Sequence, residues 1–132
     1  MALIQKKYIK LGPGSGGLSN PSSGDLDETS FSGANNQASA ANVTGLSFAN
    51  GTVRSFFAEV SVAVDATADL FEKFEIHGIQ ENSDWSISMT STGSDSQVDF
   101  SITSAGQIQY TSANYAGFSS LTINFKALTT SV

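Results

Sequence analysis

Alternating apolar and polar positions dominate the chain from residue 43 onward. Over 53–64, apolar side chains occupy every second position from Phe56 to Val64. A period of two places successive side chains on opposite faces of a β-strand, so this segment is predicted to be a strand with one buried face. Similar alternation predicts six more strands, over 43–48, 70–79, 85–90, 98–103, 107–111 and 121–127.

Turn-forming residues separate these segments. Asn50-Gly51 favours a tight turn, and Thr92–Asp95 and Ala105-Gly106 interrupt the later alternation. Seven short strands within about 90 residues predict an all-β domain over 42–132, an antiparallel β-sandwich or jelly-roll-like fold. Trp85 begins one alternating strand and is predicted to lie in the core, with an exposed sugar-stacking ring as the alternative.

Residues 12–41 lack this alternation. They are rich in Gly, Ser, Asn and Ala, and contain Pro13 and Pro21. This composition predicts a linker, in which Phe31 is the one aromatic residue and a candidate anchor point. Loops of this length are usually functional or disordered, so a partner is expected to hold the segment in place.

Residues 1–11 are predicted to form an extended attachment arm, because they alternate loosely and have nothing of their own to bury against. The first 24 residues carry three lysines and no acidic residue, whereas the other 108 carry three basic and twelve acidic residues, a charge of −9. The arm is expected to add a strand to a neighbouring subunit or to lie in an acidic groove. Its predicted docking residues are Ile4, Lys6, Lys7, Tyr8, Ile9 and Lys10.

Composition argues against several functions. A net charge of −6 and a pI near 4.4 disfavour nucleic-acid binding, which needs clustered Lys and Arg. The absence of cysteine removes disulfides and thiol nucleophiles. No apolar run approaches the roughly 18 residues of a membrane span. Met1–Ile4 is too short for the apolar part of a signal peptide.

Catalytic and metal-binding patterns are weak. His77 has Glu75 two residues away on the same predicted face, but an exposed or interface histidine explains it as well. Asp95 and Asp99 fall in a hairpin with nothing to mark a cleft. Asp25, Asp27 and Glu28 follow Gly24 but lack the full pattern of a calcium loop. We therefore predict no enzyme activity, no cofactor and no metal. Tyr110, Tyr115 and His77 remain candidates for surface recognition, Tyr115 first because it falls in a loop.

Two regions resemble proteins of tailed bacteriophages. The segment MALIQKKYIKL at 1–11 resembles the extreme N-terminus of many tailed-phage virion proteins, notably fibres. Residues 43–132 resemble a β-domain of phage structural proteins. The matching segments are NVTGLSF at 42–48, VRSFFAEVSV at 53–62, DWSISMTSTGSDS at 84–96, FSITSAGQIQYTS at 100–112 and INFKALTTSV at 123–132.

The resemblance implies a virion protein whose N-terminal segment attaches to the particle and whose β-domain is displayed, often as a trimer. This chain has no long shaft or coiled coil, so a capsid decoration protein or a short fibre fits better than a long tail fibre. Its expected partners are capsid or other virion structural proteins and further copies of itself. The alternative is a carbohydrate- or receptor-binding module of a phage tail or head fibre, with a host surface glycan as ligand.

Overall fold

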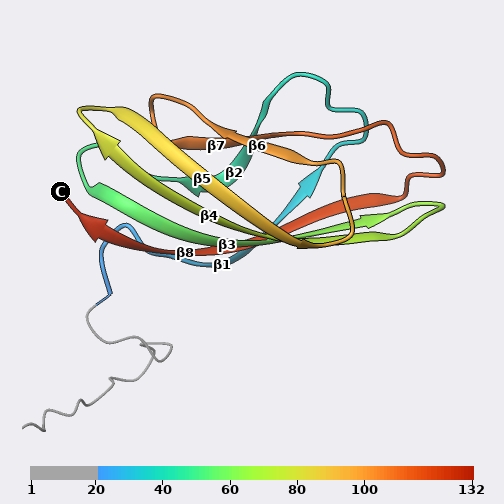
Figure 1. The fold of residues 1–132 in the computed structure, drawn as a ribbon, viewed down its shortest axis with the longest axis horizontal. Helices are drawn as coiled ribbons and strands as arrows, with labels where there is room; N and C mark the ends of the chain where they lie inside the picture. The colour runs from blue at the N-terminus through green and yellow to red at the C-terminus, as the bar shows by residue number, and fades with distance from the viewer. Residues whose placement is uncertain (1–20) are drawn as a thin grey trace, which may run out of the picture.

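The computed structural model describes residues 21–132, and in this part of the chain eight strands form two antiparallel sheets (Figure 1). The predicted attachment arm and residues 12–20 lie outside the described residues. No helix that is long and apolar enough to cross a membrane occurs in residues 21–132. The strands are β1 (Leu26–Gly33), β2 (Ala41–Ser47), β3 (Val53–Asp65), β4 (Leu70–Glu81), β5 (Asp84–Gly93), β6 (Asp99–Ile102), β7 (Gln107–Thr111) and β8 (Ser120–Ser131).

The strands form a sandwich of unequal layers. The larger sheet has the order β1-β8-β3-β4-β5, and the smaller sheet has the order β2-β7-β6 and lies across it (Figure 1). β3, β4 and β5 follow one another as a meander, while β8 returns from the end of the chain to pair with β3. The predicted all-β antiparallel sandwich is therefore confirmed, whereas the jelly-roll variant is not confirmed by this connectivity.

The core lies between the two sheets and follows the alternation in the sequence. On β3 the even-numbered side chains from Phe56 to Val64 are all buried, and on β8 the odd-numbered side chains from Leu121 to Ala127 are buried opposite them. Phe48, beyond the end of β2, stacks on Phe56 with ring centroids 3.9 Å apart. Trp85 is also buried, and its indole N–H donates to Asn50 Oδ1 at 2.8 Å, so the predicted core position is confirmed.

The linker prediction was wrong for residues 26–33, which form β1. This strand pairs with β8, with Phe31 opposite Ile123, and the Phe31 ring meets Tyr110 edge-on at 5.6 Å. β1 is an edge strand held by backbone hydrogen bonds and by its half-buried Leu26 and Phe31. β1 has only two large apolar side chains and therefore no extended alternation of apolar and polar positions. Its composition accordingly predicted a linker and not a strand.

Candidate functional site on the outer face of the large sheet

The structure buries two of the three residues predicted for surface recognition. Tyr110 is 3% exposed, and its hydroxyl accepts a hydrogen bond from the Ala34 N–H at 2.8 Å. Tyr115 is 8% exposed and donates its hydroxyl to the Ser96 carbonyl at 2.6 Å. Burial raises the pKa of Tyr115 above the ordinary value for tyrosine. The prediction that these rings are available to a ligand was therefore wrong. Tyr110 belongs to the buried face of β7, and the loop that carries Tyr115 folds so that its ring packs into the core.

His77 is exposed, as its place on the polar face of an alternating strand predicts. Its imidazole stacks on the Phe57 ring, with centroids 4.9 Å apart and planes inclined by 29°. The sheet register places Leu128 on the other side of Phe57 and Ser88 on the other side of His77. The four residues thus form one row across β8, β3, β4 and β5 on the outer face of the large sheet.

Ile79, two positions beyond His77 on β4, extends this apolar surface. Ile79 is 54% exposed and Leu128 is 47% exposed, values that are high for large apolar side chains. We call Phe57, His77, Ile79 and Leu128 the outer patch. A shallow depression of about 340 Å³ is lined by Phe57, His77 and Leu128, with the hydroxyls of Ser55 and Thr130 at its side. Those two hydroxyls are 2.5 Å apart and hydrogen-bond to each other.

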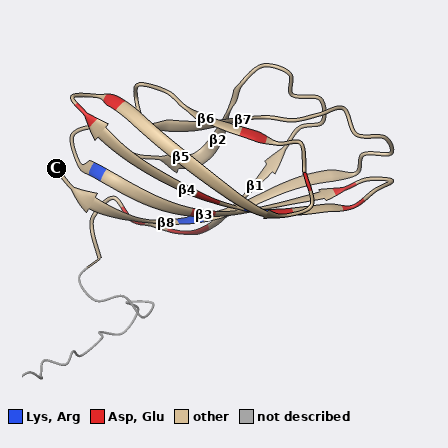
Figure 2. Ribbon diagram, viewed as in Figure 1, with Lys and Arg blue, Asp and Glu red and all other residues tan. Residues whose placement is uncertain are grey.

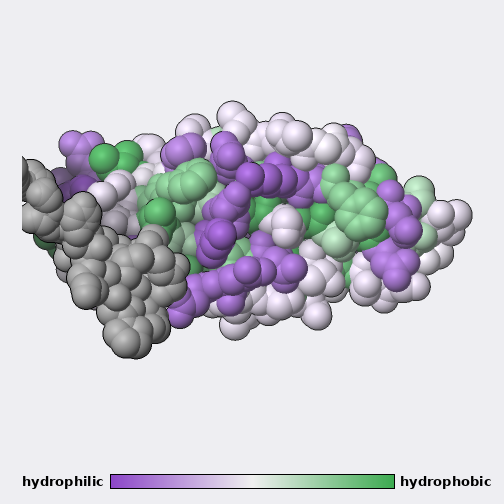
Figure 3. Space-filling view, turned by 90° about the horizontal axis from the view of Figure 1, so that it is seen from below, coloured by the Kyte–Doolittle hydropathy of each residue, from purple (hydrophilic) through white to green (hydrophobic). Residues whose placement is uncertain are grey.

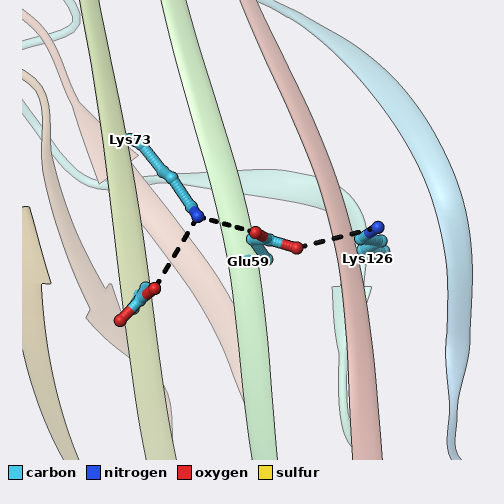
Figure 4. Close-up of polar contacts among 4 residues, drawn as sticks. Glu59, Lys73 and Lys126 are labelled. Carbon is cyan, nitrogen blue, oxygen red and sulfur yellow. Dashed lines mark ion pairs between the residues drawn. The ribbon is translucent and has the colours of Figure 1, made fainter. Parts of the chain in front are cut away.

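A row of charged side chains borders the outer patch. The Glu59 carboxylate on β3 lies 2.7 Å from the Lys73 ammonium on β4 and 3.7 Å from the Lys126 ammonium on β8 (Figure 4). The Lys73 ammonium also lies 3.7 Å from the Glu75 carboxylate. The hydrogen bond from Lys73 and the positive charge of that residue lower the pKa of Glu59, and the same contacts raise the pKa of Lys73. We call this row the charged stripe.

The outer face is therefore divided into distinct zones. Seen from this side, hydrophobic side chains form separate areas with a band of hydrophilic side chains between them (Figure 3). Beyond the charged stripe, Phe71 is 62% exposed. Acidic residues outnumber basic ones over the described chain, in which Arg54, Lys73 and Lys126 are the only basic residues (Figure 2). The face combines flat apolar areas with fixed charges, an arrangement suited to binding a macromolecule or a sugar ring.

Of the carboxylates considered for metal binding, Asp25 occupies a structural position. Asp25 accepts hydrogen bonds from the Ser22 N–H and from both the N–H and the hydroxyl of Thr129. Asp27 and Glu28 are exposed on β1. No cluster of three or more potential metal ligands occurs in residues 21–132. Glu75 and His77 share a face, but His77 stacks on Phe57.

The sequence analysis missed most of the outer patch. Phe57 follows Phe56 directly, and Leu128 follows Ala127, so each puts an apolar side chain on the face that the alternation assigns to polar residues. Ile79 occupies the same face as His77, two positions further along β4. An apolar residue that breaks the alternation on an otherwise polar face was the available signal for this surface.

The chain was compared with known proteins. No protein-family model matches it, and no curated protein matches it. Among solved structures it is similar to the crystal structure of the Acinetobacter phage vB_ApiP_P1 tailspike protein, with 12% sequence identity and a TM-score of 0.45. The match covers 84% of this chain and 21% of the tailspike chain, so the chain spans about a fifth of the length of that protein.

Proposed function

We propose that this chain is a non-enzymatic structural protein of a tailed-phage particle. In this proposal residues 1–11 dock on a capsid or another virion protein, and the sandwich is displayed on the particle surface as a capsid decoration or a short fibre. Two features of the sequence support it: the basic arm in front of an acidic body, and the resemblance of both regions to phage virion proteins.

One structural observation carries the proposal. The chain enters the sandwich at a fixed point, because Ser22 and Asp25 are hydrogen-bonded to Thr129 near the end of β8. The buried apolar side chains of the described region all come from 43–127 and form one cluster that joins both sheets. The sandwich domain has its own core, and its first residues are fixed to β8. A segment that precedes it can therefore attach it to a particle without contributing to its fold.

The experiment is particle incorporation. Phage particles would be assembled with the full chain, with a chain lacking residues 1–11, or with a Lys6→Gln, Lys7→Gln and Lys10→Gln variant. We expect the deletion to abolish incorporation and the charge variant to reduce it, most at high salt. The isolated sandwich should still melt cooperatively. Undiminished incorporation of the deleted chain would refute the docking role of the arm.

A second candidate function is recognition of a host-surface glycan. It is favoured by the stack of the half-buried Phe57 and the exposed His77 and by the neighbouring hydroxyls of Ser55 and Thr130, since sugar rings bind on aromatic faces with polar groups beside them. Binding to a glycan array that is lost in Phe57→Ala and retained in Phe71→Ala would support this function. Equal loss in both variants, or no binding by the full chain, would count against it.

A further inference from the structure

β5 is a long edge strand with no strand paired to its outer side in the described part of the chain. It pairs with β4 over ten positions, from Glu81–Asp84 to Glu72–Gly93, without a register shift. After Asp84 it carries no charged residue (Figure 2), and its sequence contains no proline. Natural proteins usually interrupt such an edge with charges, proline or bulges, because its free N–H and C=O groups recruit another strand.

The other three edges of the sandwich carry these protective features. β1 has a register shift between Leu26 and Thr29, and the charged Asp27 and Glu28 lie within it. β2 is irregular between Asn42 and Ser47, around a glycine with positive φ. β6 has only four residues and begins with an aspartate. Of the edges in the described structure, β5 alone is regular, long and free of charged residues after its first position.

The inner side of β5 also leaves apolar surface incompletely covered. Ile87 is half-buried and Met89 is 40% exposed, although the register places Met89 opposite Ile76, which is fully buried. Both side chains therefore point toward the core layer at a position where the described chain provides no further strand. A strand added beside β5 would cover them.

We propose that the partner of this edge is β5 of a second copy, paired antiparallel about a two-fold axis that passes midway between the Ser88 residues of the two copies. Residues opposite each other in an antiparallel pair point to the same side of the sheet. Ser88 points to the outer side, so the residue opposite it must also point to the outer side. When Ser88 faces Ser88, Ile87 of each copy lies opposite Met89 of the other, and Ser86 lies opposite Thr90. The apolar pairs fall on the inner face and the hydroxyl pairs fall on the outer face.

This register also avoids charge repulsion. Asp84, the one charged residue of β5, lies opposite Thr92 of the partner and far from the partner's Asp84. Opposite apolar pairs and Ser–Thr pairs are both favourable across antiparallel strands. The two large sheets become one continuous sheet of ten strands, joined by an isologous contact of the kind found in most dimers. The copy number is then two, in place of the trimer that the phage resemblance implies. The inference stands independently of the proposed function.

The first test measures the mass of the full chain by sedimentation equilibrium over a range of concentrations. We expect a dimer whose dissociation constant rises by about tenfold or more in Met89→Lys, because a charge then faces Ile87 of the partner. Leu128→Lys is the matched control, with similar exposure on the outer face of β8, and should leave the dimer intact. A full chain that remains monomeric, or equal weakening by both substitutions, would overturn the proposal.

The second test fixes the register by oxidation, since the natural chain has no cysteine. Ser88→Cys should form a disulfide-linked dimer readily, because the two introduced thiols face each other. Ser86→Cys should not, because residue 86 faces Thr90 of the other copy and the two introduced thiols are four positions apart along the paired strands. The same variants without residues 1–11 should behave alike. If the dimer requires residues 1–11 and Ser88→Cys does not cross-link, the arm joins the copies and the proposal is overturned. That outcome would not contradict the proposed docking of the arm on the particle.

Discussion

The Asp25 carboxylate accepts hydrogen bonds from both the backbone N–H and the hydroxyl of Thr129, at 2.7 and 2.8 Å. The two residues are 104 positions apart in the sequence, so this contact closes the sandwich between the start of β1 and the end of β8. The Ser22 hydroxyl adds a third link by donating to the Thr129 carbonyl at 2.9 Å. The side chains of Asp25 and Ser22 thus fix the start of the domain against the end of β8.

Asp25→Ala should destabilise the domain by about 1–2 kcal/mol, because the partly buried N–H and hydroxyl of Thr129 lose their acceptor. Urea unfolding, read as a shift of the midpoint at constant slope, measures the change. Asp27→Ala is the control, since Asp27 is exposed on β1 and its side chain accepts none of these bonds. Equal effects of the two substitutions would contradict the role given to Asp25.

Gly78→Ala should destabilise the domain by about 1–3 kcal/mol through overpacking. A Cβ added at Gly78 would lie only 2.2 Å from the Phe56 ring, and that ring cannot retreat because it stacks on Phe48. Gly51→Ala is the matched control, because a Cβ there meets nothing within 4 Å. Thermal melts of the two variants should therefore separate clearly, and a neutral Gly78→Ala would show that Phe56 can move.

Much of the fold follows from the sequence because buried strands repeat a simple pattern. The inner faces of β3 and β8 alternate without interruption, so their core residues were predictable one by one. β1 was not predictable in this way, because backbone pairing with β8 supplies most of what holds it. Tyr115 was misassigned for a related reason: its burial depends on the fold of loops that are distant in sequence, with a partner at Ser96.

The candidate site was less predictable than the core. His77 was identified as a surface residue, but its stacking partner Phe57 belongs to a different strand and becomes its neighbour only through the β3–β4 register. The same register brings Leu128 beside Phe57. A sequence pattern gives the face of each residue along one strand. It does not give the row that forms across four strands.

Ser83→Gly should stabilise the domain by about 0.5 kcal/mol. Asn82 and Ser83 form the two-residue turn between β4 and β5, and both have positive φ, at 55° and 68°. Such turns favour Asn-Gly, because glycine adopts this conformation without steric cost. The gain is small because glycine also increases the entropy of the unfolded chain. Ser86→Gly, in the interior of β5, should have the opposite sign in the same unfolding measurement.

Glu72 links β4 to the loop that leads from the large sheet to the small one. Its carboxylate accepts hydrogen bonds from the N–H and the hydroxyl of Ser96, at 2.9 and 2.7 Å, and Ser96 is completely buried. Burial of Glu72 alone would raise its pKa, but the bonds from Ser96 and the Ser91 hydroxyl outweigh that effect and lower it. The charged form is thus the one that the folded state stabilises.

The lowered pKa of Glu72 determines how its contribution to stability depends on pH. A carboxyl group whose pKa is lower in the folded state stabilises the protein above its unfolded-state pKa, and the contribution is lost as the pH falls through its folded-state pKa. Glu72→Gln should therefore cost about 1–2 kcal/mol at neutral pH, because it replaces charged hydrogen bonds with neutral ones. The difference in free energy of unfolding between Glu72→Gln and the natural chain should shrink as the pH falls. Glu81→Gln, exposed on the same strand, controls for loss of charge alone. A constant difference at every pH in urea titrations would show that the charge of Glu72 does not matter to Ser96.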